Sequence, residues 1–313
     1  MPHYPFRFGV NVYGADSPET WADQARHIEA LGYDTLFIAD HFGGLPPIAG
    51  MMAAATATTT LRVGTNVLAN DFRHPLIVGA EVAAVDFFSG GRVVLGLGTG
   101  FWRQDYDQSG IPFELPGTRV GRLEEAVQIL KGTWTTAPFS FAGKYYSVRD
   151  FELSPGPQQQ PHPPILVGGG GRRILALAAR EANIVGFGRR STRSGGFDTD
   201  SDTPDATAEK VAWVRQAAGE RFEQLEFSFL ASFAAVTDDP VTTAQRLAQG
   251  WRELGVDIVA DQILRSATSL IGTVDEIVAK LEHARERYGF SFIVIGESQI
   301  DEFAPIVKQL SGT

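Results

Sequence analysis

The chain has 313 residues, of which 43% are hydrophobic and 20% are charged, a composition typical of a globular protein rather than a disordered one. Its formal net charge of −10 argues against nucleic acid or an anionic membrane surface as a partner. Cysteine is absent, which excludes disulfides, thiolate metal sites and a cysteine nucleophile, and fits a reducing compartment.

The chain begins with "MPHYPFRFGV", which lacks the apolar region of a signal peptide. No apolar run is long enough for a membrane span, so we expect a cytoplasmic protein. An apolar segment at 6–12 predicts the first strand. Ser17 and Pro18 are a typical cap and first residue of a helix, which Gly32 would end. The pattern then predicts strands over 35–39, 61–68 and 92–98, and helices over 48–57, 75–88 and 119–134.

The second half of the chain continues the alternation. Thr273 and Glu276 form a capping box at the start of a predicted helix. We predict strands over 163–168, 183–187, 227–236 and 290–296, and helices over 172–182, around 211–214, and over 242–254, 274–288 and 303–310. Eight strands alternating with helices predict a parallel sheet, and the length fits a single α/β domain, a (β/α)₈ TIM barrel over 1–313. A doubly wound sheet is the main alternative.

Two stretches are longer than ordinary connections. One, at about 135–163, is rich in Pro, Gln and Gly. The other, at about 188–206, is polar and rich in Gly, Ser and Asp. We expect the second to be either a mobile lid over the barrel mouth or a disordered insertion.

Asp40 and His41 follow the apolar run of the second predicted strand, within "LFIADHF". Active sites of barrels form at the carboxyl ends of the strands, and a charge placed there needs a partner. Histidine is also the side chain best suited to proton transfer near neutral pH. The alternative is that the two side chains merely cap a loop. The six histidines show no HExxH-like spacing, so we expect no metal site.

Four glycines, Gly168 to Gly171, follow the fifth predicted strand and precede Arg172 and Arg173. Glycines allow a ligand to approach the backbone, and a following helix presents free N–H groups to a phosphate. The alternative is a flexible turn. The run matches neither the P-loop nor the G-x-G-x-x-G dinucleotide motif. After the fourth strand, "GTGFWRQDY" supplies aromatic side chains that either line a pocket for a flat ring or pack at the barrel top.

Together these stretches resemble the luciferase-like monooxygenase superfamily of flavin and deazaflavin oxidoreductases. The similarity covers nearly the whole chain and rests on "GYDTLFIADHF", "RHP", "VDFFSGGRVVLGLGTG", "RLEEAVQILKGTW", "FAGKYYSV", "PPILVGGGGRR" and "LIGTVDEIVAKL". The resemblance implies a bacterial luciferase-like (β/α)₈ barrel with insertions, and a homodimer.

Asp40-His41 is similar to the Asp-His pair of the branch that uses the deazaflavin coenzyme F-420 (8-hydroxy-5-deazaflavin). The resemblance implies that Asp40 contacts the cofactor ring region and that His41 is catalytic. It also implies a non-prolyl cis peptide between Asn66 and Val67 behind the ring. Further cofactor contacts are implied at Ala69, Gln104, Gly169, Gly170, Gly171 and Arg172.

Two positions depart from the deazaflavin-dependent sugar-phosphate dehydrogenases. Leu45 stands where those enzymes have Trp, and Phe101 where they have Glu. A polar sugar-phosphate pocket is therefore not expected. Leu45, Phe101 and Trp102 instead predict a pocket for a more apolar substrate.

The sequence therefore predicts hydride transfer between coenzyme F-420 and a small, rather apolar organic molecule. One alternative is an FMN-dependent monooxygenase that uses O₂ and a separate flavin reductase, because the phosphate loop suits either cofactor. A second alternative is a barrel that binds flavin without catalysis.

Overall fold

The computed structural model describes residues 1–192, 196–253 and 256–313. Within them, eight parallel strands form a ring in the order β3-β2-β1-β15-β12-β9-β8-β5, and the pairing of β3 with β5 closes it. The two-residue β4 (Leu68–Ala69) continues β3 along β5. The strands of the ring are β1 (Arg7–Val12), β2 (Thr35–Ile38), β3 (Arg62–Thr65), β5 (Val93–Gly98), β8 (Ile165–Gly169), β9 (Ile184–Phe187), β12 (Glu226–Leu230) and β15 (Phe290–Gly296). The predicted barrel is confirmed, because a doubly wound sheet would stay open.

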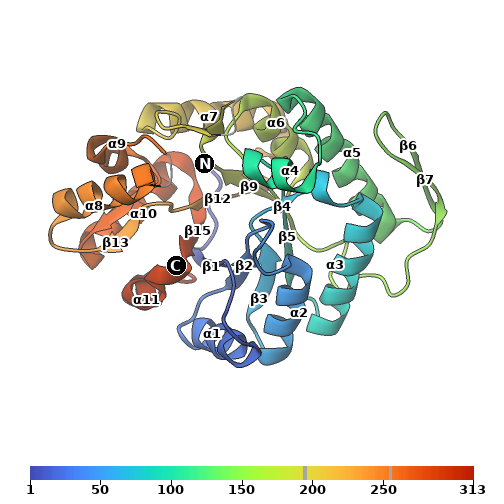
Figure 1. The fold of residues 1–313 in the computed structure, drawn as a ribbon, viewed down its shortest axis with the longest axis horizontal. Helices are drawn as coiled ribbons and strands as arrows, with labels where there is room; N and C mark the ends of the chain where they lie inside the picture. Colours follow the sequence, from blue (N-terminus) through green and yellow to red (C-terminus); the bar gives the residue numbers. More distant parts are fainter. Residues whose placement is uncertain (193–195, 254–255) are drawn as a thin grey trace.

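Helices surround this ring (Figure 1). They are α1 (Pro18–Ala30), α2 (Pro47–Ala57), α3 (Pro75–Ser89), α5 (Pro116–Thr135), α6 (Arg172–Glu181), α7 (Pro204–Ala218), α10 (Val274–Tyr288) and α11 (Ile300–Leu310). The caps predicted from the sequence form. Ser17 accepts a hydrogen bond from the Thr20 N–H, and Thr273 accepts one from the Glu276 N–H. In the described parts of the chain, no helix is both long and apolar enough to cross a membrane.

The structure differs from the predicted elements at two places. No element is predicted over 103–109, yet these residues form the short helix α4 (Arg103–Ser109). The predicted strand over 227–236 is two strands, because a turn at Ser232 separates β12 from β13 (Ala234–Val236). β13 leaves the barrel and pairs with β14 (Leu270–Gly272).

Besides the two long stretches at about 135–163 and 188–206, the segment at 231–272 therefore also leaves the barrel, as a third excursion. Between β13 and β14 it carries α8 (Pro240–Glu253) and α9 (Ala260–Arg265). Its own small apolar core consists of Phe233, Ala244, Ala248, Ile258, Ile263 and Ile271. In Figure 1 this excursion lies at the left of the barrel.

Both long stretches predicted from the sequence contain antiparallel hairpins. In 135–163 the strands are β6 (Phe139–Ala142) and β7 (Ser147–Phe151), at the right edge of Figure 1. In 188–206 they are β10 (Arg190–Ser191) and β11 (Phe197–Asp198). Residues 193–195 of the second stretch lie outside the described residues.

Candidate active site at the barrel mouth

The backbone changes course after β3, at the mouth. The Asn66–Val67 peptide bond is cis, as predicted. The Val67 side chain points into the barrel, where a Cβ atom at Gly96, Gly98 or Gly168 would come within 3.3, 2.5 and 3.2 Å of it, respectively. Gly98 and Gly168 therefore make room for Val67, whereas a Cβ atom at Gly96 would first meet the Thr65 backbone carbonyl.

Asp40 is held by this segment. Its two carboxylate oxygens accept hydrogen bonds of 2.7 and 2.9 Å from the Arg73 guanidinium. One of them, Oδ2, also accepts a hydrogen bond of 3.0 Å from the Ala69 N–H. The Asp40 side chain is 5% exposed. Because both oxygens are already engaged, the geometry gives Asp40 a part in fixing Ala69 and Arg73, and direct contact with a cofactor ring stays a prediction.

His41 points to a partner that the sequence analysis missed. Its Nδ1 lies 2.8 Å from Oδ2 of Asp105, whose Oδ1 accepts a hydrogen bond of 3.2 Å from the Phe42 N–H. The Asp105 side chain is 10% exposed, that of His41 31%. A carboxylate on Nδ1 favours the tautomer with its proton there. Nε2, which has no partner among the described residues, is then the nitrogen left for proton transfer.

Asp105 was missed because α4 is only seven residues long and has no apolar periodicity. The one signal for it is Gly110, whose φ of 73° ends the helix in the left-handed region. The helix is fixed by Tyr106, whose hydroxyl donates to the Thr99 carbonyl at 2.9 Å and lies 3.2 Å from Asp71 Oδ2, the alternative acceptor for its single proton. Burial raises the pKa of Tyr106, so it remains a neutral donor. The sequence left open whether these aromatic side chains line a pocket or pack at the barrel top. Tyr106 packs.

Two aromatic rings lie beside His41. The Trp102 ring is 5.2 Å away and the Phe101 ring 6.3 Å away, both edge-on to the imidazole. Leu45, also predicted to line the pocket, packs beside Gly50 and against the main core. Gln104 is exposed on α4. The structure thus brings Phe101 and Trp102 together with His41.

The glycines after β8 have different surroundings. A Cβ at Gly169 would lie 2.4 Å from Ile174, and one at Gly170 would lie 2.4 Å from the Arg189 backbone. A Cβ at Gly171 would meet no atom within 4 Å. Gly171 is also the N-cap of α6 and provides no side-chain cap for its first N–H groups. Packing therefore explains the first three glycines, and only the Gly171 end leaves space for a phosphate.

Arg172 begins α6 at this open end. Its side chain is exposed and donates a hydrogen bond of 3.1 Å to Gln216 Oε1. A guanidinium beside an uncapped helix start is a suitable donor for a phosphate. The residues present at this point of the mouth therefore fit the phosphate of a flavin or deazaflavin.

Comparison with known proteins agrees with this architecture. The model of the family described as luciferase-like monooxygenase matches residues 4–291. An F-420-dependent glucose-6-phosphate dehydrogenase of Amycolatopsis mediterranei (strain U-32) is 30% identical over 172 residues, which are 52% of this chain and 51% of that protein. An FMNH(2)-dependent dimethylsulfone monooxygenase of Pseudomonas putida is 34% identical over 128 residues, 41% of this chain and 35% of that protein. The chain thus spans about half the length of these curated relatives, or less.

Solved structures share the fold over a longer stretch. The coenzyme F-420-dependent tetrahydromethanopterin reductase of Methanopyrus kandleri superposes with a TM-score of 0.80 and covers 98% of this chain and 100% of its own. The identity is 19%, so this likeness concerns the fold alone.

Proposed function

The chain belongs to the luciferase-like monooxygenase family, and on that premise we propose that it is an oxidoreductase that transfers a hydride between coenzyme F-420 and a small, rather apolar organic substrate. The observation that carries the proposal is the His41–Asp105 pair at the barrel mouth, 2.8 Å apart, with Nε2 of His41 left without a partner among the described residues. Relatives named as F-420-dependent dehydrogenases support it.

The coenzyme would bind between two backbone features. The first turn of α6, with Gly171 and Arg172, would hold its phosphate. The segment from Asn66 to Ala69 would lie behind its ring, and Asp40 would position that segment through Ala69 and Arg73. When bound, the deazaflavin carries the hydride, while the protein supplies orientation and electrostatics.

His41 would handle the proton that accompanies the hydride. When a substrate carbon gives up a hydride, a neighbouring atom loses a proton, and Nε2 of His41 accepts it; in the reverse direction Nε2 donates it. Asp105 keeps the imidazole oriented and stabilises its charged form. Phe101 and Trp102 form apolar surface beside this nitrogen, which favours a substrate with few polar groups.

A second candidate is an FMN-dependent monooxygenase that uses O₂ and a separate flavin reductase. The relative from Pseudomonas putida favours it, and the open phosphate site suits FMN equally well. A barrel that binds flavin without turnover is the third candidate, and a homodimer remains a prediction from the family resemblance.

The test is a fluorescence titration of the purified protein with coenzyme F-420 and, separately, with FMN. We expect F-420 to bind at least about tenfold more tightly, a difference of about 1.4 kcal/mol. Tight binding of FMN alone would overturn the choice of coenzyme F-420 and favour the monooxygenase alternative. Turnover is then followed as the change in deazaflavin absorbance with a panel of apolar alcohols and alkenes, in both directions.

Two neighbouring glycines provide a matched pair of variants. Gly171→Ala adds a methyl group in open space, so it should leave folding unchanged but weaken F-420 binding several-fold by crowding the phosphate. Gly170→Ala pushes a methyl group against the Arg189 backbone and should destabilise the fold by about 1–3 kcal/mol. If Gly171→Ala binds F-420 as the wild type does, the phosphate is not held at this loop.

A further inference from the structure

The insertion at 188–206 contributes a side chain to the mouth that the sequence analysis did not single out. The ring of Phe197, in β11, packs against the ring of Phe101 with centroids 4.6 Å apart and planes tilted by 39°. Phe101 in turn lies edge-on to His41. The described part of this insertion therefore reaches Phe101, which lies beside the proposed catalytic residue His41.

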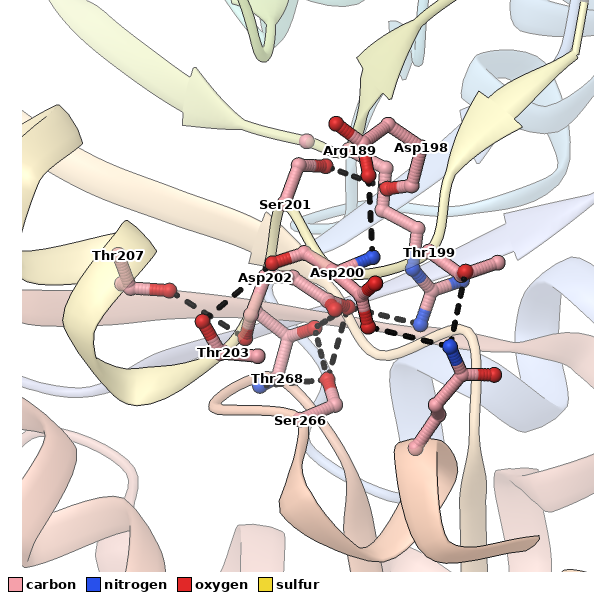
Figure 2. Close-up of polar contacts among 12 residues, drawn as sticks. Arg189, Asp198, Thr199, Asp200, Ser201, Asp202, Thr203, Thr207, Ser266 and Thr268 are labelled. Carbon is pink, nitrogen blue, oxygen red and sulfur yellow. Dashed lines mark hydrogen bonds and ion pairs between the residues drawn. The ribbon is translucent and has the colours of Figure 1, made fainter. Parts of the chain in front are cut away.

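Asp202 anchors the same insertion at its other end (Figure 2). Its Oδ2 lies 2.7 Å from the Arg189 guanidinium, and it accepts hydrogen bonds of 2.8 Å from Ser266 Oγ and 3.4 Å from Thr268 Oγ1. The Asp202 backbone carbonyl also accepts 2.8 Å from the Ala267 N–H. The Asp202 side chain is 5% exposed, so these buried polar contacts connect the insertion to the excursion at 231–272.

The residue after Phe197 is tied down as well. The Asp198 carboxylate accepts hydrogen bonds of 3.1 and 2.5 Å from Arg190, across the short β10–β11 hairpin. The Asp198 carbonyl accepts 2.6 Å from Ser201 Oγ, whose oxygen in turn accepts 2.8 Å from the Arg190 N–H. The described residues of the hairpin are thus hydrogen-bonded to one another, which supports a fixed position for Phe197.

We propose that Phe197 is a specificity-determining residue that completes, with Phe101 and Trp102, an aromatic wall beside His41 and selects substrates that carry a flat apolar ring. Aromatic rings prefer offset or edge contacts with one another, and the tilted faces of this wall offer both kinds to an incoming ring. Asp202 acts through Phe197 and is a positioning residue. The inference deepens the proposed function and rests on it.

The test is the binding of 2-naphthol, followed by its fluorescence, to protein saturated with coenzyme F-420. We expect Phe197→Ala to weaken binding about five- to tenfold, and Phe197→Leu, which keeps apolar bulk without a ring, to weaken it less. The matched control is Phe88→Ala, which removes an aromatic ring that is 70% exposed on α3, and it should bind 2-naphthol as the wild type does. Failure of the wild type to bind 2-naphthol, or unchanged binding by Phe197→Ala, would overturn the proposal.

Asp202→Asn tests the positioning role. It should weaken 2-naphthol binding while leaving F-420 affinity unchanged, and it should add little in the Phe197→Ala background, because the side chain it positions is then absent. Asp205→Asn, at an exposed site on α7, is the control. Equal further weakening in both backgrounds would show that Asp202 does not act through Phe197. If F-420 itself fails to bind the wild type, the proposed function fails. The binding of 2-naphthol to the free wild type and to Phe197→Ala then still tests whether the aromatic wall binds a flat apolar ring.

Discussion

Arg7, at the N-terminal end of the barrel, lies between two carboxylates, whereas His41, at the mouth, has one. Arg7 donates from Nε and Nη2 to Glu226 at 2.9 and 2.8 Å, and from Nη1 to Asp34 at 3.0 Å. Its guanidinium also lies 4.0 Å from the centre of the Phe292 ring. His41 is bound to Asp105 through a single nitrogen.

The difference also appears in the pKa values. Burial lowers the pKa of Arg7, but the nearby carboxylates of Glu226 and Asp34 raise it by more. The net change in pKa is therefore upward, and Arg7 stays charged. Burial is the largest effect on Glu226 and raises its pKa, against the opposing effect of Arg7. Charges that satisfy one another in this way contribute to folding rather than to chemistry. At the mouth, by contrast, Nε2 of His41 has no partner among the described residues.

The largest effect on stability is expected for Glu226→Gln. Removing one charge of a largely buried pair leaves Arg7 short of a partner, and we expect a loss of about 3 kcal/mol in the free energy of unfolding. Turnover per folded molecule should stay near the wild-type value. Chemical denaturation measures the first quantity, with Glu223→Gln at an exposed position of the same segment as the control. A large loss of turnover in the folded variant would contradict a purely structural role.

Asp105→Asn applies the same isosteric change at the mouth. Turnover in the deazaflavin assay should fall about 10- to 100-fold, because the amide can still bond to His41 but no longer stabilises its charged form. The free energy of unfolding should change by less than about 1 kcal/mol. Asp107→Asn, exposed on the same helix, is the control. Unchanged turnover in Asp105→Asn would remove Asp105 from the mechanism.

Lys210 should make the stability of the fold depend on pH. Its Nζ donates a hydrogen bond of 2.7 Å to the Gly188 carbonyl, near the glycine loop. Burial lowers the pKa of Lys210 to about 8, although the Asp202 carboxylate partly opposes this shift. Between about pH 8 and its ordinary value of 10.5, the unfolded chain binds more protons at this site, so its contribution to stability rises with pH. From pH 7.5 to 10 the wild type should gain about 1–2 kcal/mol over Lys210→Met. Parallel pH curves of the two proteins would refute this.

The barrel could be predicted because its signals are local. Alternating apolar strands and amphipathic helices recur along the chain, and the capping box of Thr273 and Glu276 marks the start of α10. The break between β12 and β13 could not be seen, since both are apolar and only pairing partners distinguish them. The split follows from which strand each one meets in space.

The site could be predicted only in part, for the same reason. His41 could be found from its place after a strand, but its partner Asp105 comes from a helix 64 residues away along the chain. The glycine run indicates a phosphate loop, yet three of its four glycines are required because a Cβ atom there would crowd Val67, Ile174 or the Arg189 backbone. Such requirements arise only once distant segments are folded together.

The most direct test of the account is the single-turnover rate of hydride transfer in His41→Ala at saturating coenzyme F-420, measured beside its affinity for the coenzyme and its free energy of unfolding. We expect a rate about 10²- to 10⁴-fold below the wild type, with coenzyme affinity and stability nearly unchanged. A near-normal rate in the folded, coenzyme-bound variant would contradict the proposal, because hydride transfer would then proceed without the imidazole proposed to move the proton.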